Sequence, residues 1–181
     1  MKLMFASDIH GSLYYCKKLQ NIFNEKKPDK LILLGDLLYH GPRNDLPKDY
    51  NPKGVIEILN SMKQNILAVR GNCEAEVDQM VLEFPCMADY MILYLGDKMA
   101  FVTHGHIHNN SNPPMLNKGD LLIHGHTHIQ AVEEVNGYIY INPGSVSIPK
   151  NGNTNSYMML ENNTFVIKSL EGKEIIKYTV K

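Results

Sequence analysis

The first half of the chain alternates short apolar runs with stretches of helical periodicity, and this alternation restricts the folds open to it. Apolar runs at residues 3–6, 31–34 and 66–69 predict buried strands. Apolar residues recur every three or four positions over residues 13–23, 55–62 and 74–82, which predicts helices. Because strand–helix–strand units place successive strands side by side, the pattern predicts a parallel sheet with crossover helices.

A polar cluster follows each of the three apolar runs. In parallel α/β sheets, ligands bind at the carboxyl ends of the strands. The three clusters are therefore expected to meet at one edge of the sheet, although they are distant in sequence. They are Ser7-Asp8-Ile9-His10-Gly11, Gly35-Asp36 and Gly71-Asn72-Cys73-Glu74.

After Pro85 the pattern changes to short strand-like runs separated by turn signals. The runs occupy residues 90–95, 99–103, 121–123, 131–135, 138–141, 157–160, 164–169 and 175–180. Turn pairs at 136–137, 152–153, 162–163 and 171–172 suit hairpins. With 181 residues, the chain is expected to form a single domain over residues 1–181. The expected fold is α/β, with two packed mixed sheets and helices outside.

All eight histidines lie between positions 10 and 128, and several of them follow predicted strands. Together with the earlier clusters they supply two carboxylates, one amide and four imidazoles, a set that suits Mn²⁺, Fe²⁺, Zn²⁺ or Ni²⁺. Seven ligands are too many for one catalytic ion with an open position, and they fit two ions that share a carboxylate. The alternative is that Asp and Asn only cap turns. The candidate metal ligands are Asp8, His10, Asp36, Asn72, His104, His126 and His128.

The order of these motifs resembles the signature of the calcineurin-like metallophosphoesterases. It consists of Asp8-x-His10, Gly35-Asp36, Gly71-Asn72-x-Glu74, His104-Gly105-His106 and Gly125-His126-x-His128. More narrowly, residues 35–44, 70–74 and 142–150 resemble the YfcE-type bacterial phosphodiesterases, and the resemblance runs to about residue 157.

The resemblance implies a four-layer αββα sandwich and a centre of two divalent metal ions. Mn²⁺ is the leading candidate, with Ni²⁺, Zn²⁺ or Fe²⁺ as alternatives. The activity it implies is hydrolysis of a small phosphodiester by a metal-activated water. Asp36 would be shared between a first ion held by Asp8, His10 and His128, and a second ion held by Asn72, His104 and His126.

Two positions depart from the wider superfamily. Cys73 stands where a His or Asp is assigned to protonating the leaving group, and His40 stands where related protein phosphatases carry a phosphate-binding Arg. His40 and Arg43 are candidate phosphate contacts, and His106 is a candidate for a second-shell or substrate role. Both departures favour a diester substrate. The 142–145 segment is expected to form a turn that braces the site.

The alternatives are a phosphomonoesterase or protein phosphatase on the same scaffold, and a non-catalytic interaction scaffold. The near-neutral charge, with 18 basic and 19 acidic residues, argues against a broad nucleic-acid or membrane surface. Three cysteines without a C-x-x-C pair, no membrane-length apolar run and an early charged residue indicate a cytoplasmic protein. A homo-oligomer, either dimer or tetramer, stays open.

Overall fold

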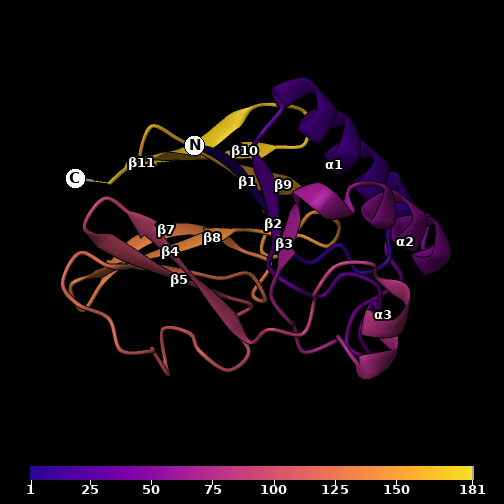
Figure 1. Ribbon diagram of the computed structural model, residues 1–181, viewed down its shortest axis with the longest axis horizontal. Coiled ribbons are helices and arrows are strands. Elements are labelled where there is room, and N and C mark those ends of the chain that lie inside the picture. Colours follow the sequence, from indigo (N-terminus) through magenta and orange to yellow (C-terminus); the bar gives the residue numbers. More distant parts are fainter. Residues whose placement is uncertain (181) are drawn as a thin grey trace.

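The computed structural model describes residues 1–180, which form two β-sheets packed against each other (Figure 1). The first sheet contains β1 (Lys2–Ala6), β2 (Lys30–Leu33), β3 (Ile66–Ala68), β9 (Ser156–Glu161), β10 (Thr164–Ser169) and β11 (Glu174–Thr179). Its strand order is β11-β10-β9-β1-β2-β3. The second sheet contains β4 (Tyr90–Leu95), β5 (Lys98–Thr103), β6 (Leu121–Ile123), β7 (Gln130–Val135) and β8 (Tyr138–Pro143), in the order β4-β5-β6-β8-β7.

The three parallel strands of the first sheet are connected by helices, as the alternating pattern predicts. β1 pairs parallel with β2, and β2 pairs parallel with β3. α1 (Leu13–Lys26) and α2 (Pro52–Ser61) make the two crossovers and bury Leu19 and Leu59 against the sheet. Ser12 caps α1, because its Oγ accepts a hydrogen bond from the Tyr15 N–H at 3.4 Å.

The second sheet is mixed as well, but no helix covers it. Its central strands β5, β6 and β8 run parallel, and β4 and β7 pair antiparallel at the two edges. All the helices of residues 1–180, including the short α3 (Glu76–Val81), precede β4 in the chain. On its outer face lies the 104–120 segment, whose Leu116 packs against the buried cluster of Phe101, Leu122, Ala131, Tyr138 and Tyr140. The two mixed sheets are confirmed, whereas the outer layer on the second sheet is a loop.

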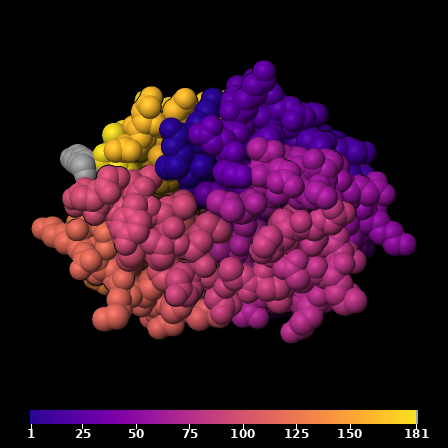
Figure 2. Space-filling model, in the orientation of Figure 1, coloured from indigo at the N-terminus to yellow at the C-terminus, as the bar shows by residue number. Residues whose placement is uncertain are grey.

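The inner faces of the two sheets share one apolar core. Phe5, Ile32 and Phe165 of the first sheet pack against Val102 and Ile141 of the second, and all five are buried. Burial of this shared face fixes one sheet on the other, so that the carboxyl ends of β1, β2, β3, β5, β6 and β8 come to one end of the molecule. Figure 2 shows one face of the molecule, on which the indigo and purple first half of the sequence lies mostly to the right and the orange and yellow second half mostly to the left.

Three of the four predicted hairpin turns connect paired strands. The turns at 136–137, 162–163 and 171–172 connect β7–β8, β9–β10 and β10–β11. The prediction of a hairpin at 152–153 is wrong, because that turn lies on the connection from β8 in one sheet to β9 in the other. Within residues 1–180, no helix has both the length and the apolar character needed to cross a membrane.

Candidate metal centre

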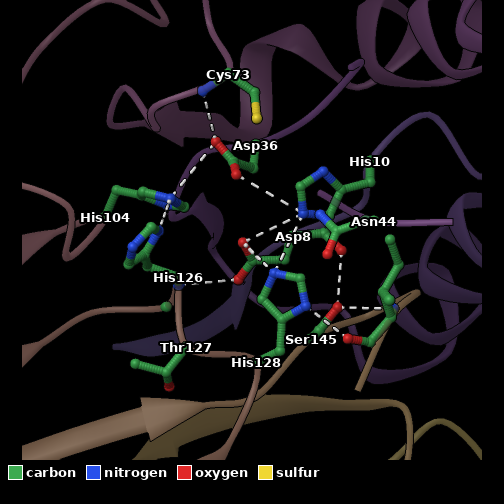
Figure 3. A network of polar contacts seen from close by, with 12 residues as sticks. Asp8, His10, Asp36, Asn44, Cys73, His104, His126, Thr127, His128 and Ser145 are labelled. Atoms are coloured by element: carbon green, nitrogen blue, oxygen red, sulfur yellow. Dashed lines mark hydrogen bonds and ion pairs between the residues drawn. The ribbon is translucent and has the colours of Figure 1, made fainter. Parts of the chain in front are cut away.

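The seven predicted ligands come together at the carboxyl ends of five strands, and Figure 3 labels all of them except Asn72. Asp8 and His10 follow β1, Asp36 follows β2, and Asn72 follows β3. His104 follows β5, and both His126 and His128 follow β6. Asp8 and His104 have no exposed surface, and His10 is 1% exposed. Polar side chains of this kind are rarely buried so completely without a partner or an ion.

One group of side chains surrounds Asp8. His128 Nε2 lies 3.3 Å and His10 Nε2 lies 3.7 Å from Asp8 Oδ1. The Nε2 atoms of His10 and His128 are 3.2 Å apart, and Asp36 Oδ2 lies 3.7 Å from His10 Nε2. These four side chains point their ligand atoms into one small space.

A second group lies on the other side of Asp36. His104 Nε2 is 3.5 Å from Asp36 Oδ1 and 3.2 Å from Asn72 Oδ1. His126 Nδ1 is 3.1 Å from the same His104 nitrogen. Asp36 therefore presents one oxygen to each group, as a carboxylate shared by two ions would.

The hydrogen bonds of the imidazoles fix which nitrogen of each ring faces this space. Nδ1 of His10, His104 and His128 lies 2.6–2.7 Å from the carbonyl oxygens of Tyr39, Leu34 and Ile148. Because a carbonyl only accepts, Nδ1 carries a proton in each ring, and Nε2 is the nitrogen that faces the carboxylates. Asp8 Oδ1 has no hydrogen-bond partner. Carboxylate, amide and imidazole ligand atoms held this close together form a donor set that fits divalent metal ions.

The electrostatics of the cluster also favour a cation. Burial raises the pKa of Asp8, but His128 and then His104 outweigh it, so the carboxyl pKa lies well below its usual range. Burial lowers the pKa of His104, yet the carboxylates of Asp36 and Asp8 overcome this and raise it to about 9. Burial and the charge of His104 lower the pKa of His126 to about 4. Two ionised carboxylates thus draw positive charge into a buried space.

Five of the candidate ligands adopt the left-handed backbone conformation that non-glycine residues rarely take. Their φ angles are between 49° and 64°, at Asp8, His10, Asp36, His126 and His128. Such conformations cost about 1–3 kcal/mol each and persist where the surrounding structure fixes them, often at functional sites. Here they turn the side chains inward immediately after each strand ends.

Glu74 holds the backbone of this site, a role that the sequence did not reveal although the residue lies in the Gly-Asn-x-Glu motif. Its Oε2 accepts hydrogen bonds from the N–H groups of Asp36 and Gly71, at 2.8 and 2.6 Å, and its Oε1 accepts one from Leu37 at 2.7 Å. Burial raises the pKa of Glu74 to about 7, and Asp36 adds to the effect, whereas the three N–H donors lower it. This carboxyl group positions Asp36 between the two groups of ligands.

The turn after β8 holds Asp8 in a similar way. The hydroxyls of Ser145 and Ser147 both donate to the backbone carbonyl of Asp8, at 3.0 and 2.9 Å. Val146 N–H donates to the Ser7 carbonyl at 2.9 Å. The predicted bracing turn is therefore present, and Ser145 is occupied by hydrogen bonds to the backbone.

The remaining candidates lie around the cluster at different distances. Cys73 Sγ lies within reach of a metal ion that His10 and Asp36 would hold, and burial followed by the charge of Asp36 raises the pKa of this thiol. His106 packs beside His104, with ring centroids 5.4 Å apart. His40 is placed between two tyrosine rings, those of Tyr39 and Tyr50, with centroids at 4.8 and 5.1 Å.

A shallow hollow opens over the cluster. Asp36, Cys73 and His128 line it, and so does Arg43, a candidate phosphate contact. His40 does not line it. Lys150 does, and the sequence motifs did not single out this residue. The hollow therefore has two cationic side chains beside the candidate ligands.

Two packed mixed sheets, with a buried histidine–aspartate cluster where their strands end, define the class of this protein. It belongs to the calcineurin-like phosphoesterase superfamily, and the model of that family, described as "Calcineurin-like phosphoesterase superfamily domain", matches residues 1–164. The resemblance found in the motifs is confirmed.

Within that superfamily, the chain is a homologue of phosphodiesterase YfcE from Escherichia coli K12. The two are 47% identical over 176 residues, which cover 97% of this chain and 96% of the relative. A solved structure of YfcE, titled as a phosphoesterase from E. coli, superposes with a TM-score of 0.96 at 45% identity and covers all of both chains. Phosphodiesterase MJ0936 from Methanocaldococcus jannaschii is 29% identical over 152 residues, 80% of this chain and 83% of that one.

Proposed function

We propose that this protein is a metal-dependent phosphodiesterase that hydrolyses a small phosphodiester with water as the nucleophile. The observation that carries the proposal is the convergence of carboxylate, amide and imidazole ligand atoms around the buried Asp8 and Asp36, where Asp8 Oδ1 has no hydrogen-bond partner. The names of two relatives, both phosphodiesterases, support the same reaction.

The grouping of distances supports two ions that share Asp36. Asp8, His10 and His128 would hold one ion with Asp36 Oδ2, since their ligand atoms lie within 3.2–3.7 Å of one another along the contacts described. The other ion would be held by Asp36 Oδ1 together with Asn72, His104 and His126.

The reaction adds water to a phosphodiester and yields a phosphomonoester and an alcohol. One P–O bond forms to the water oxygen, the P–O bond to the leaving alcohol breaks, and a proton goes to that alcohol. Divalent ions supply Lewis acidity, which lowers the pKa of water and stabilises negative charge on phosphoryl oxygens. The chain fixes the ligands through Glu74 and the 145–147 turn, and Arg43 and Lys150 supply positive charge where the substrate enters.

Cys73 supports a diester substrate over a monoester. Burial and then the charge of Asp36 raise the pKa of its thiol in the protein without metal ions. A neutral thiol donates a weak hydrogen bond and adds no positive charge. It therefore does not replace the histidine or aspartate that the resemblance to the wider superfamily assigns to protonating the leaving group, and this departure favours the diester.

The test compares a chromogenic phosphodiester, bis(p-nitrophenyl) phosphate, with its monoester, p-nitrophenyl phosphate. Metal-stripped protein receives Mn²⁺, Ni²⁺, Zn²⁺ or Mg²⁺ in turn, and bound metal is counted. Metal-dependent cleavage of the diester with little cleavage of the monoester is expected. A preference for the monoester would contradict the interpretation of Cys73, and binding of two ions without any hydrolysis would contradict the proposed activity.

Matched variants show whether the cluster carries the reaction. Replacing groups that only orient metal ligands costs about 10–100-fold, so Asp36→Asn is expected to lower kcat by at least ~100-fold. His108→Asn is the control, because this ring packs edge-on against Phe101 on the outer face of the second sheet, with centroids 5.3 Å apart. The control is expected to keep wild-type turnover and metal content.

The same proposal includes Mn²⁺ as the preferred ion, a cytoplasmic location and assembly into a dimer or tetramer. The donor set supports Mn²⁺, Fe²⁺, Zn²⁺ and Ni²⁺ alike, and cellular availability decides among such metals. Metal analysis of protein purified without added metal tests the first part, cell fractionation the second, and light scattering the third.

A further inference from the structure

The hollow over the candidate metal centre contains more positive charge than a simple phosphodiester needs. Arg43 and Lys150 both line it, and the only carboxylate among its lining residues is Asp36, a candidate metal ligand. Within residues 1–180, neither Arg43 nor Lys150 forms an ion pair. Two cations that form no ion pair and line the same hollow indicate an anionic partner.

Lys150 is anchored to the site by its backbone. Its N–H donates to the carbonyl of His128 at 3.2 Å, and its carbonyl accepts hydrogen bonds from the backbone and side chain of Asn153, at 3.0 and 2.8 Å. The adjacent Ile148 carbonyl accepts from His128 Nδ1 at 2.6 Å. The backbone of Lys150 is therefore held in a fixed position relative to His128, a candidate metal ligand.

Arg43 approaches from a separate segment, the 40–44 turn. Asn44 Nδ2 closes this turn by donating to the His40 carbonyl at 2.8 Å. Gly41 lies so close to Cys73 that an added Cβ would be 3.4 Å from the thiol sulfur. The turn thus rests on the cluster, and the two cations reach the hollow from segments about 100 residues apart in the chain.

Charge balance shows what these cations are for, given the proposed function on which this inference rests. Two divalent ions together with Asp8 and Asp36 leave two positive charges, since the carboxylate of Glu74 is already balanced by three backbone N–H donors. A phosphodiester anion and a deprotonated water neutralise both. The charges of Arg43 and Lys150 then remain unbalanced, and they match a second anionic group elsewhere on the substrate.

We infer that Arg43 and Lys150 select a phosphodiester that bears a further anionic group, a phosphate or carboxylate, on one of its two arms. A guanidinium suits such a group through paired N–H donors, and an ammonium through its charge. The pair determines specificity through substrate affinity, since both side chains are exposed on the wall of the hollow and neither is a candidate metal ligand.

The test uses two substrates with the same leaving group: thymidine 5′-(p-nitrophenyl phosphate) with and without a 3′-phosphate. An exposed ion pair contributes up to ~1 kcal/mol, which corresponds to about fivefold in affinity. Arg43→Gln and Lys150→Gln are each expected to raise KM about fivefold for the substrate with the 3′-phosphate and less than twofold for the other. The wild-type preference is expected to weaken as salt is added.

The matched control is Lys17→Gln, an exposed lysine on α1 that lines no part of the hollow. It removes one positive charge and is expected to leave both KM values unchanged. An equal loss on both substrates in Arg43→Gln and Lys150→Gln would place the cations on the scissile phosphate and overturn the inference. No loss on either substrate would also overturn it.

A binding measurement separates this inference from the proposed function. Calorimetric titration compares thymidine 3′,5′-bisphosphate with thymidine 5′-monophosphate, on metal-stripped and on metal-loaded protein. Tighter binding of the bisphosphate that disappears in the two variants supports the inference even if no diester is hydrolysed. Diester hydrolysis without any preference for the bisphosphate would leave the proposed function standing and refute the inference.

Discussion

Gly125 lies directly before His126 and so close to the end of β1 that no side chain fits at its position. A Cβ at this position would lie 1.8 Å from Ser7 Oγ and 2.8 Å from Asp8 Oδ2. Overpacking a buried site costs about 1–3 kcal/mol, and here the groups displaced include a candidate ligand. We expect Gly125→Ala to lose that much unfolding free energy in urea and to bind less metal.

The control for this substitution is Gly152→Ala. Gly152 has a φ of 74° and nothing within 4 Å of an added Cβ. Its replacement therefore tests backbone strain without a clash, and this strain is expected to cost about 1 kcal/mol in unfolding free energy. Metal content should stay at the wild-type level in Gly152→Ala, and an equal loss of metal in both variants would contradict the steric explanation for Gly125.

Glu74 gives a second prediction at this scale. Glutamine has the same shape but keeps only one acceptor oxygen, whereas the carboxylate accepts from three backbone N–H groups. Hydrogen bonds to a charged group contribute about 1.5–3 kcal/mol. Glu74→Gln should therefore lose about 2 kcal/mol in unfolding free energy and about 10–100-fold in metal affinity.

Glu76→Gln serves as the matched change for Glu74→Gln. Glu76 is exposed in the first turn of α3 and accepts no hydrogen bond from another residue within the described part of the chain. Removal of its charge should change stability by less than ~1 kcal/mol. If Glu74→Gln binds metal as tightly as Glu76→Gln does, Glu74 does not position Asp36.

Single residues also show where the sequence was sufficient and where it was not. The seven candidate ligands were predictable, because each one follows an apolar run and such strand ends meet in space. Lys150 was not predictable, because it reaches the hollow only through the fold of the 143–150 connection. His40 lies between tyrosines at positions 39 and 50, a contact that the order of residues does not reveal.

At the scale of elements, the turn after β8 gives a prediction about additivity. Ser145 and Ser147 donate to the same carbonyl of Asp8, at 3.0 and 2.9 Å. In each single variant the remaining hydroxyl still donates to this buried carbonyl. In the double variant neither hydroxyl does. Unsatisfied buried groups cost about 1–3 kcal/mol. The double variant Ser145→Ala/Ser147→Ala should therefore lose more stability than the sum of the single variants in a denaturation cycle.

An additive cycle would show that the two serines act independently of Asp8. Ser145→Ala should lose more unfolding free energy than Ser147→Ala, because Ser145 Oγ also accepts from the N–H groups of Ser147 and Ile148, at 3.2 and 2.9 Å. The coupling energy, rather than the single losses, therefore decides the prediction.

Local sequence patterns predicted the helices and strands themselves. They did not always predict which element each one packs against or pairs with. All three helices and the strands of both sheets occur where the periodicity placed them, to within a few residues. The turn at Gly152-Asn153 has hairpin chemistry but connects two sheets, since a local turn signal says nothing about which strand follows as a neighbour. The outer cover of the second sheet is similar: Leu116 packs there from a segment without any regular periodicity.

At the scale of the whole molecule, the candidate metal centre joins the two sheets. Asp8, His10 and Asp36 come from the first sheet, and His104 and His128 follow strands of the second. Ions bound between them would hold both sheets in the folded state and find no such site in the unfolded chain. Binding of this kind stabilises the protein by about 2.7 kcal/mol at a free metal concentration 100 times Kd.

We therefore expect the metal-loaded protein to unfold in one transition at a Tm about 5–10 °C above that of the metal-stripped protein, since 1 kcal/mol corresponds to about 2–4 °C for a chain of this size. Calorimetry with increasing Mn²⁺ measures the shift. Asp36→Asn should abolish it, because this residue contacts both groups of ligands. Asp97→Asn, at an exposed position between β4 and β5, should keep it. An undiminished shift in Asp36→Asn would mean that metal stabilises the protein at some other place, and the centre between the two sheets would have to be abandoned.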